Sequence, residues 1–347
     1  MTANGNDIVI TGFTSISAAG VGNGPLREAL LDGQSRLQPV PVEILAEEGH
    51  LWGKVDSFRA ADFMPPLKAR KFDRCSMLAV AATGLALKEA GVELPLPQPE
   101  GAGLALGCGF GGIANSLEFL TGYFNNGVDG LAPMLFPNTV PNAAASNASI
   151  EHGIKGPNVT IVQRFCSAET AMMMACRFLA EGRADMMLTG GVDELNPFML
   201  KGFKAMGQMR SYGGGFGEGA GVLALERRSH AEERGAFIRG VLGDIRTVGL
   251  LPRGLEEEGT TRLLGPSSPP SLISLSGTAD LSPLLAGRLP VVPRLEIHKF
   301  VGRSLAMGGV ALVALLLSLK PGERGLHLAA SPEGGFFAID VIGGASA

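Results

Sequence analysis

The chain has 347 residues, of which 46% are hydrophobic and 18% are charged, and its 29 basic and 33 acidic side chains give a formal net charge of −4. This composition excludes an intrinsically disordered chain, which needs low hydrophobicity and high net charge. It also excludes a nucleic-acid-binding protein that relies on bulk positive charge, because no basic run is present. Since the chain contains 50 glycines and one tryptophan, we expect a core of small and aliphatic side chains.

The targeting and cysteine patterns point to a cytoplasmic protein. The apolar run Gly308–Leu319 has roughly a dozen residues, whereas a membrane span needs about 20, so we expect a buried helix and no membrane span. The N-terminal sequence has neither the basic nor the apolar region of a signal peptide. Cys75, Cys108, Cys166 and Cys176 form no CxxC pair and no metal-binding spacing with the five histidines. We therefore expect reduced thiols, no metal site and no cofactor.

In the first two thirds of the chain, short apolar runs typical of strands alternate with helical patterns that end at glycine. The expected strands are Asp7–Ile10, Gly103–Leu106, Asn158–Val162, Asp185–Leu188 and Ala220–Glu226. The expected helices are Ser76–Ala90, Thr170–Leu179 and a short one around Ala231–Gly235. The glycine-rich run Gly107–Gly112 lacks the spacing of a dinucleotide-binding loop and predicts a tight turn. This alternation predicts an α/β fold with buried sheets.

The last third of the chain has a weaker pattern. The segment Arg246–Leu289 is rich in Pro, Gly, Ser and Glu, and only Ser271–Leu275 within it is typical of a strand. We expect Glu256–Glu258 to lie in a solvated loop. The pattern then predicts a strand at Leu295–His298, the helix at Gly308–Leu319, and two final strands at Leu326–Ala329 and Phe336–Ile342.

Three segments together resemble the β-ketoacyl synthase family of the thiolase fold: Phe136–Ala144, which runs on to Gly156–Asn158; Ile161–Ala171; and Gly215–Gly221. The resemblance extends from Asp7 to about Gly240 and is looser beyond. It implies an α/β thiolase-like fold with two related βαβ halves in a layered α-β-α-β-α arrangement. The N-terminal ketosynthase-like half would be residues 1–240, and a shortened C-terminal thiolase-like half would be residues 241–347.

The family's catalytic positions carry unusual residues in this chain. In the family, a cysteine at a strand-to-helix turn is the nucleophile, and two histidines from the second half assist it. The register places Phe165 at the cysteine position, and it places Ser276 and Arg303 at the histidine positions. A phenyl ring is no nucleophile, a serine hydroxyl is a poor acid or base, and a guanidinium does not release its proton. We therefore expect no catalysis of condensation, while Glu218 resembles a structural glutamate that binds backbone amides near the turn.

Chain-length factors of the same family resemble this pattern, because they lack the cysteine and pair with an active ketosynthase whose acyl tunnel they help to shape. The resemblance implies such a subunit in type II polyketide, polyene or fatty-acid biosynthesis. Its partners would be an active ketosynthase subunit, in a heterodimer, and an acyl carrier protein. The family's dimer strand corresponds to Asn158, Val159, Thr160, Ile161 and Val162. Chain-length factors commonly carry glutamine at the position of Phe165, which is a departure.

Two alternatives remain open at this stage. The first is a non-catalytic homodimer that serves as a scaffold and binds acyl carrier protein. The second is an acyltransferase that uses Cys166 as nucleophile and His298 as base, because a helix N-terminus favours a thiolate. The sequence equally fits Cys166 as a small core residue. Two other features receive structural interpretations only: Arg164 and Glu169 flank the turn and could form a local ion pair, and His327 has no expected function.

Overall fold

The computed structural model describes residues 4–209, 215–250, 254–265, 268–277, 281, 288–289, 291–332 and 334–344. Within these residues an 11-stranded sheet runs in the order β12-β11-β13-β14-β10-β1-β9-β7-β5-β6, with β2 (Gly20–Val21) paired to β1. Its first part contains β1 (Ile8–Ser17), β5 (Ala102–Cys108), β6 (Asn158–Val162), β7 (Met186–Asp193) and β9 (Gly219–Arg227). Its second part contains β10 (Gly240–Val248), β11 (Leu272–Gly277), β12 (Arg294–Leu295), β13 (Arg324–Ala330) and β14 (Phe336–Gly343). The strands β3 (Gln38–Pro39), β4 (Leu51–Gly53) and β8 (Phe216–Gly217) form a small second sheet.

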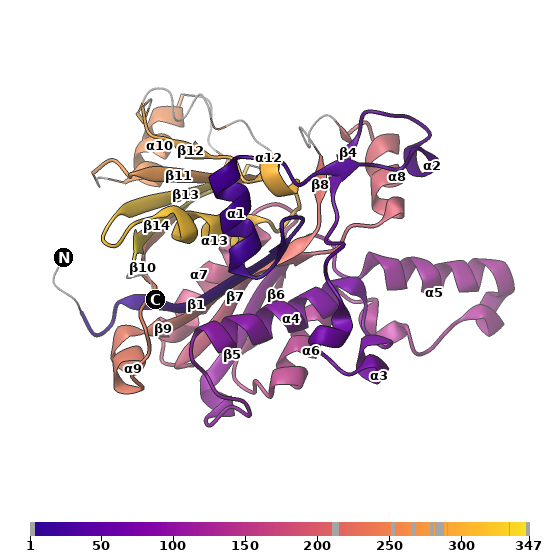
Figure 1. The fold of residues 1–347 in the computed structure, drawn as a ribbon, viewed down its shortest axis with the longest axis horizontal. Helices are drawn as coiled ribbons and strands as arrows, with labels where there is room; N and C mark the ends of the chain where they lie inside the picture. The colour runs from indigo at the N-terminus through magenta and orange to yellow at the C-terminus, as the bar shows by residue number, and fades with distance from the viewer. Residues whose placement is uncertain are drawn as a thin grey trace.

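The helices cover both faces of the first part of the sheet (Figure 1). The larger helices are α1 (Asn23–Asp32), α4 (Arg74–Glu89), α5 (Ile113–Asn126), α6 (Ala143–His152), α7 (Ser167–Ala180), α8 (Pro197–Ala205), α10 (Glu256–Leu264) and α13 (Gly308–Ser318). The shorter ones are α2 (Val42–Leu45), α3 (Pro66–Ala69), α9 (Arg228–Glu233) and α12 (His298–Val301), with 3₁₀ turns η1 (Ala60–Asp62), η2 (Pro99–Gly101), η3 (Gly127–Gly130) and η4 (Phe136–Asn138).

Strand β9 shows why the strands in the first part of the sheet have continuous apolar sequences. Val222 and Ala224 pack in the core that contains α4, whereas Leu223 and Leu225 pack in the core that contains α7 and α13. Successive side chains of a strand point to opposite faces, so a strand with a core on each face is apolar at every position. The sheet is therefore buried on both sides here.

The helix α13 forms the middle layer of the molecule. It contacts β1 and β9 of the first part and also β11 and β13 of the second part, whereas α10 packs on β10 and β14. With α4 and α6 outside the first part of the sheet, the layers run α-β-α-β-α. The expected α/β, thiolase-like architecture is confirmed.

Most predicted elements are present with ends shifted by a few residues, but two predictions are wrong. Glu256–Glu258 is not a loop: it forms the exposed first turn of α10, where acidic side chains favour a helix N-terminus. His298 does not end a strand, because β12 stops at Leu295 and His298 is the first residue of α12. The pattern also missed α5 and β10. The segment whose resemblance to the family assigns Ser276 is Leu275–Thr278, and its last residue lies outside the described residues.

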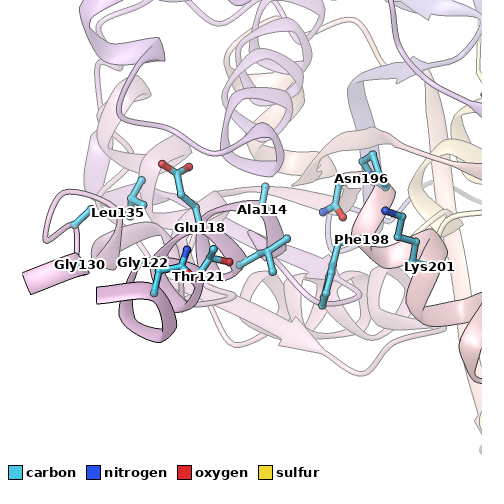
Figure 2. Close-up of a pocket in the computed structure, with 13 residues that line it drawn as sticks. Ala114, Glu118, Thr121, Gly122, Gly130, Leu135, Asn196, Phe198 and Lys201 are labelled. Carbon is cyan, nitrogen blue, oxygen red and sulfur yellow. The ribbon is translucent and has the colours of Figure 1, made fainter. Parts of the chain in front are cut away.

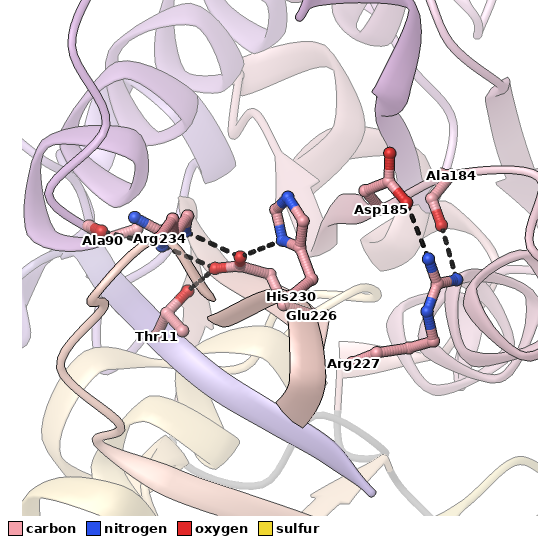
Figure 3. A network of polar contacts seen from close by, with 8 residues as sticks. All are labelled: Thr11, Ala90, Ala184, Asp185, Glu226, Arg227, His230 and Arg234. Carbon is pink, nitrogen blue, oxygen red and sulfur yellow. Dashed lines mark hydrogen bonds and ion pairs between the residues drawn. The ribbon is translucent and has the colours of Figure 1, made fainter. Parts of the chain in front are cut away.

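A buried network closes the end of the sheet where β9 finishes (Figure 3). The fully buried carboxylate of Glu226 accepts hydrogen bonds from Thr11 on β1 and from Arg234, and His230 lies 2.6 Å away on α9. Arg234 also donates to the carbonyl of Ala90 after α4. Glu226 pairs in register with Met186, the first residue of β7, so this network lies at the opposite end of β7 from Asp193.

Among the described helices, none is both long enough and apolar enough to cross a membrane. The most apolar of them, α13, has 11 residues and is buried along most of its length.

Candidate functional site

The turn between β6 and α7 carries the residues matched to the family's nucleophile. Arg164 and Cys166 adopt left-handed backbone conformations, with φ of 55° and 64°, which non-glycine residues rarely adopt. Ser167 stabilises the turn, since its hydroxyl donates to the carbonyl of Arg164 (2.6 Å) and accepts from the amide of Gln163 (3.0 Å). The chain thus reverses sharply at residues 163–166, directly before the helix.

Phe165 and Cys166 both point into the protein. Each is 3% exposed, and both belong to one apolar cluster that also contains Phe216 and Leu305. The sulfur of Cys166 lies 4.0 Å from the carbonyl oxygen of Gly335. A small cavity beside Phe216 and Leu305 has a volume of about 10 Å³, which is about the space for one water molecule. Aromatic and aliphatic side chains therefore fill this region.

Ser276 belongs to a buried polar cluster formed by Glu169, Ser274, Ser276 and His327. Its hydroxyl donates to Glu169 Oε1 (2.6 Å), and His327 Nε2 lies 2.9 Å from the same oxygen. Ser274 Oγ lies 2.8 Å from the other ring nitrogen of His327. Burial opposes the charge on Glu169, but the hydrogen bonds from His327 and Ser276 hold the pKa of its carboxyl below the ordinary value.

One expectation about this cluster is wrong. Glu169 does not pair with Arg164, because its carboxylate points to His327 and Ser276. His327, to which the sequence assigned no function, is fully buried and connects β13 to α7. The residues are 158 positions apart along the chain, so no local sequence pattern could reveal the pair.

Arg303 and His298 lie on either side of Gly302. Arg303 pairs through its backbone with Gly215 and Gly217 and lines the small cavity. Burial, together with the positive charge of Arg303, lowers the pKa of His298 to about 4. The imidazole is therefore uncharged at neutral pH and a weak base.

Glu218 holds three segments together. Its fully buried carboxylate accepts hydrogen bonds from the backbone amides of Val55 (3.0 Å) and Leu195 (3.2 Å) and from the guanidinium of Arg74 (2.8 Å). Lys54 lies 3.4 Å away. Burial works against ionisation, but Arg74 and Lys54 keep the pKa of Glu218 below its usual value.

Two adjacent acidic residues at the end of β7, which the sequence analysis missed, bind backbone amides of the segment after β5, the start of α5 and the segment before α13. Asp193 accepts hydrogen bonds from the amides of Gly109 (2.7 Å) and Ala306 (2.5 Å), and Glu194 accepts one from the amide of Ala114 (2.8 Å). Burial raises the pKa of Asp193 to about 6 and that of Glu194 to about 7. The feature of the sequence that could have identified them is the pair of adjacent carboxylates at the end of a buried strand.

The strand β6 lies at the end of the sheet order and leaves one edge without a neighbouring strand in the described residues. Its Val162 is 50% exposed. Of the neighbouring elements, α6 contacts β6, η4 contacts α6, and α5 contacts η4. Large apolar side chains are exposed on these elements and on the chain between them: Phe124, Val128, Met134, Phe136, Val140 and Ile150. Exposed apolar side chains beside an unpaired strand edge make this region a candidate interaction surface.

The helix α5 has no buried residue and projects from the body of the molecule (Figure 1); we call α5 and η3 the arm. A groove of about 730 Å³ lies between the arm, the segment that returns from it, and the start of α8. Ala114, Leu117, Leu135 and Phe198 give it apolar walls. Figure 2 shows Glu118 on the α5 side and Lys201 on the α8 side. Its volume lies in the range of ligand-binding pockets.

Across the described part of the chain, no three His, Cys, Asp or Glu side chains are placed to hold a metal ion.

Comparisons with known proteins agree on the kind of fold. The family model of the β-ketoacyl synthase N-terminal domain matches residues 5–231. A 3-oxoacyl-(acyl-carrier-protein) synthase 2 of Rhizobium meliloti is 30% identical over 258 residues, which are 67% of this chain and 61% of that protein. The corresponding protein of Vibrio harveyi is 29% identical over 249 residues, 67% of this chain and 60% of its own. The matches thus span about three fifths of the length of these relatives.

Solved structures of ketosynthases share the architecture. The ishigamide ketosynthase/chain length factor superposes with a TM-score of 0.81 at 20% identity, covering 97% of this chain and 99% of that one. A type II polyketide synthase acyl-carrier protein in complex with its ketosynthase bound to the hexaketide gives a TM-score of 0.82 at 19% identity, with the same coverage of both chains. A β-ketoacyl synthase from Burkholderia phymatum gives 0.82 at 21% identity, again with 97% and 99% coverage.

Proposed function

Because the chain belongs to the β-ketoacyl synthase family, we propose that it is a non-catalytic, ketosynthase-like subunit of the chain-length-factor type. It acts in the cytoplasm, in type II polyketide, polyene or fatty-acid biosynthesis. The observation that carries this proposal is the burial of Phe165, the residue that the sequence matches to the family's nucleophile. The ring belongs to the same apolar cluster as Leu305 and Phe216, which supports a filled site without room for a loaded acyl group.

The other two catalytic positions support the same conclusion. The hydroxyl of Ser276 donates a hydrogen bond to the carboxylate of Glu169 and is held in a buried cluster. Arg303 carries a guanidinium, which stays protonated at every working pH. Neither group can take and return a proton during condensation. His298, the base of the alternative mechanism with Cys166, is too weak a base at a pKa of about 4.

An active partner subunit would then supply the chemistry. The free edge of β6 and the exposed apolar side chains beside it support a partner at this face. The proposed partner is a ketosynthase that retains its cysteine, and an acyl carrier protein delivers the substrate to the pair. A homodimer of this chain would have no intact catalytic site, which favours the heterodimer.

The groove at the arm supports a role in shaping the product. Its apolar walls suit an acyl chain, and its volume is large enough for one. A side chain that enlarges or narrows the groove would then change how long a chain the complex can hold.

Coexpression with an intact ketosynthase from the same biosynthetic system tests the pairing. The wild type should copurify with it as a stable complex. Val162→Glu places a carboxylate on the β6 edge. It should lower the affinity of the complex at least tenfold, because the interface would remove the hydration of this charge. Leu31→Glu on α1 introduces the same charge at a site that is 81% exposed and serves as the control. Failure of the wild type to form any complex overturns the proposal.

The products of the complex test the groove. Ala114→Phe narrows it and should shift the products toward shorter chains, whereas Leu120→Phe enlarges a side chain that is 49% exposed on the same helix and does not line the groove. An unchanged product length for Ala114→Phe in a complex of normal yield would refute a role of the groove in chain length.

A further inference from the structure

The helix α5 begins without a cap of its own. Gly112 is its N-cap residue and provides no side-chain hydrogen bond, and its first turn contains no acidic residue. The first amides of a helix have no partner within the helix, so an uncapped start is unfavourable. Here Glu194, 80 residues further along the chain, fills this role: its Oε1 accepts the amide of Ala114 at 2.8 Å. The start of the arm is therefore fixed by a side chain from the end of β7.

A second carboxylate lies at the same place. Asp73 caps α4 through Oδ1, which accepts the amide of Ser76, and its Oδ2 lies against Gly112 so closely that any side chain there would collide with it. Glu194 is 3% exposed and Asp73 is 2% exposed. One oxygen of each, Oε2 and Oδ2, has no hydrogen-bond partner among the described residues. A second buried negative charge beside an incompletely bonded carboxylate is costly.

We propose that Glu194 is a positioning residue that caps α5 from outside the helix, and that the charge on its carboxyl sets how firmly the arm is held. The neutral acid still accepts the amide of Ala114 through its carbonyl oxygen. The ionised form makes the same hydrogen bond, but its negative charge is then buried away from water and close to Asp73, which costs free energy. Detachment of the arm exposes Glu194 to solvent and removes that cost, so ionisation favours the detached arm.

The surroundings of Glu194 make it the group that changes charge near neutral pH. The titratable and charged side chains on the elements around it are Asp73 at the N-cap of α4, Cys75 on α4, Cys108 on β5, Asp193 on β7, Glu118 on α5 and Lys201 on α8. Burial, assisted by Asp73, raises the pKa of Glu194 to about 7, from 4.5 in water. Burial raises the pKa of Cys108 to about 12 and that of Cys75 well above its usual value, so both thiols stay neutral. Asp193 ionises at lower pH, and its oxygens bind Gly109 and Ala306 rather than α5.

The direction of the effect follows from this raised pKa. Below pH 4.5 the carboxyl is neutral in both states, and the arm stays attached. Between pH 4.5 and pH 7 the detached state releases a proton that the held state keeps, so a rising pH favours detachment. Above pH 7 both states are ionised and the preference changes no further. A rise in pH from acidic to neutral therefore loosens the arm and the groove that it borders. The effect of this on a partner or an acyl chain rests on the proposed function, but the loosening itself does not.

Hydrogen exchange of the α5 amides in the full chain tests the proposal, as protection factors corrected for the intrinsic exchange rate. Between pH 4.5 and pH 8 the wild type should lose protection on the order of a hundredfold in the first two turns of α5. Glu194→Gln keeps the acceptor but cannot ionise, so its protection should stay high at both pH values. Glu194→Ala removes the cap and should give low protection at both.

Glu93→Gln, at an exposed position after α4, serves as the matched control and should behave as the wild type does. The proposal is overturned if the wild type keeps at pH 8 the protection that it has at pH 4.5, or if Glu194→Gln loses protection to the same extent. Both outcomes are read without a partner or substrate, so they are distinct from a failure of the proposed function. If Glu194→Ala does not fold, the comparison of wild type with Glu194→Gln still decides the question.

Discussion

The carboxylate of Glu169, one turn beyond Phe165 on α7, lies 2.9 Å from Nε2 of His327 on β13, and both side chains are buried. The pair lies next to Ser276, the residue that the sequence register matches to a catalytic histidine of the family. A polar group that is buried without a partner costs free energy, so the pair and the two serines complete one another. The residues around Ser276 thus form a connected structural cluster, in which Oε1 of Glu169 is hydrogen-bonded and Oε2 has no hydrogen-bond partner among the described residues.

Loss of one partner of this cluster should destabilise the protein strongly. His327→Ala leaves the Glu169 carboxylate buried without its main partner and should lower the free energy of unfolding by about 3–5 kcal/mol. Urea denaturation at pH 7 measures this. His50→Ala removes a histidine from a partly exposed pair and should cost about 1 kcal/mol or less. A loss below about 1 kcal/mol for His327→Ala would contradict the structural role of the pair.

The same cluster should make stability depend on pH in the acid range. A carboxyl whose pKa is lowered by folding stabilises the protein above its unfolded pKa, and this contribution is lost as the pH falls through the folded value. Glu169 has a lowered pKa. Between about pH 4.5 and pH 3 the wild type should therefore lose stability more steeply than Glu169→Gln. Parallel curves in urea denaturation across this range would argue against the assigned ionisation.

Phe165 should contribute to stability as a core residue does. Phe165→Ala removes a buried ring and should cost about 3–5 kcal/mol, whereas Phe165→Leu should cost less than about 1.5 kcal/mol because it conserves volume better. Chemical denaturation of the two variants measures the difference. A negligible cost for Phe165→Ala would mean that the ring does not fill the site.

Glu218 should be required for the attachment of three segments. Glu218→Ala leaves the amides of Val55 and Leu195 unbonded and removes the partner of Arg74. We expect a loss of about 3 kcal/mol or more in the free energy of unfolding. Asp56→Ala, at an exposed position one residue after Val55, should have almost no effect. Equal stability of the two variants would contradict the role of Glu218.

Periodicity predicted the elements whose side chains are buried on one or both faces. β9 and α13 are examples, because nearly every residue in them is apolar and contacts a core. The helix of the arm was not predicted because it lacks these features: α5 has no buried residue, no local cap and no acidic first turn. α12 has four residues, too few for a helical period to be distinguished from a strand.

The site shows a similar division. The register placed Phe165, Ser276 and Arg303 by their spacing from glycines and prolines, a local property of the chain. The partners of these residues depend on contacts between distant segments. Glu169 and His327 are 158 residues apart and Glu194 and Ala114 are 80 apart, so only the folded chain brings them together.

The proposal that this subunit carries no acyl group is tested most directly by intact mass spectrometry of its complex with a ketosynthase after incubation with an acyl thioester. We expect the acyl group on the ketosynthase alone, with the mass of this chain unchanged. An acyl adduct on this chain that disappears in Cys166→Ser would contradict the account.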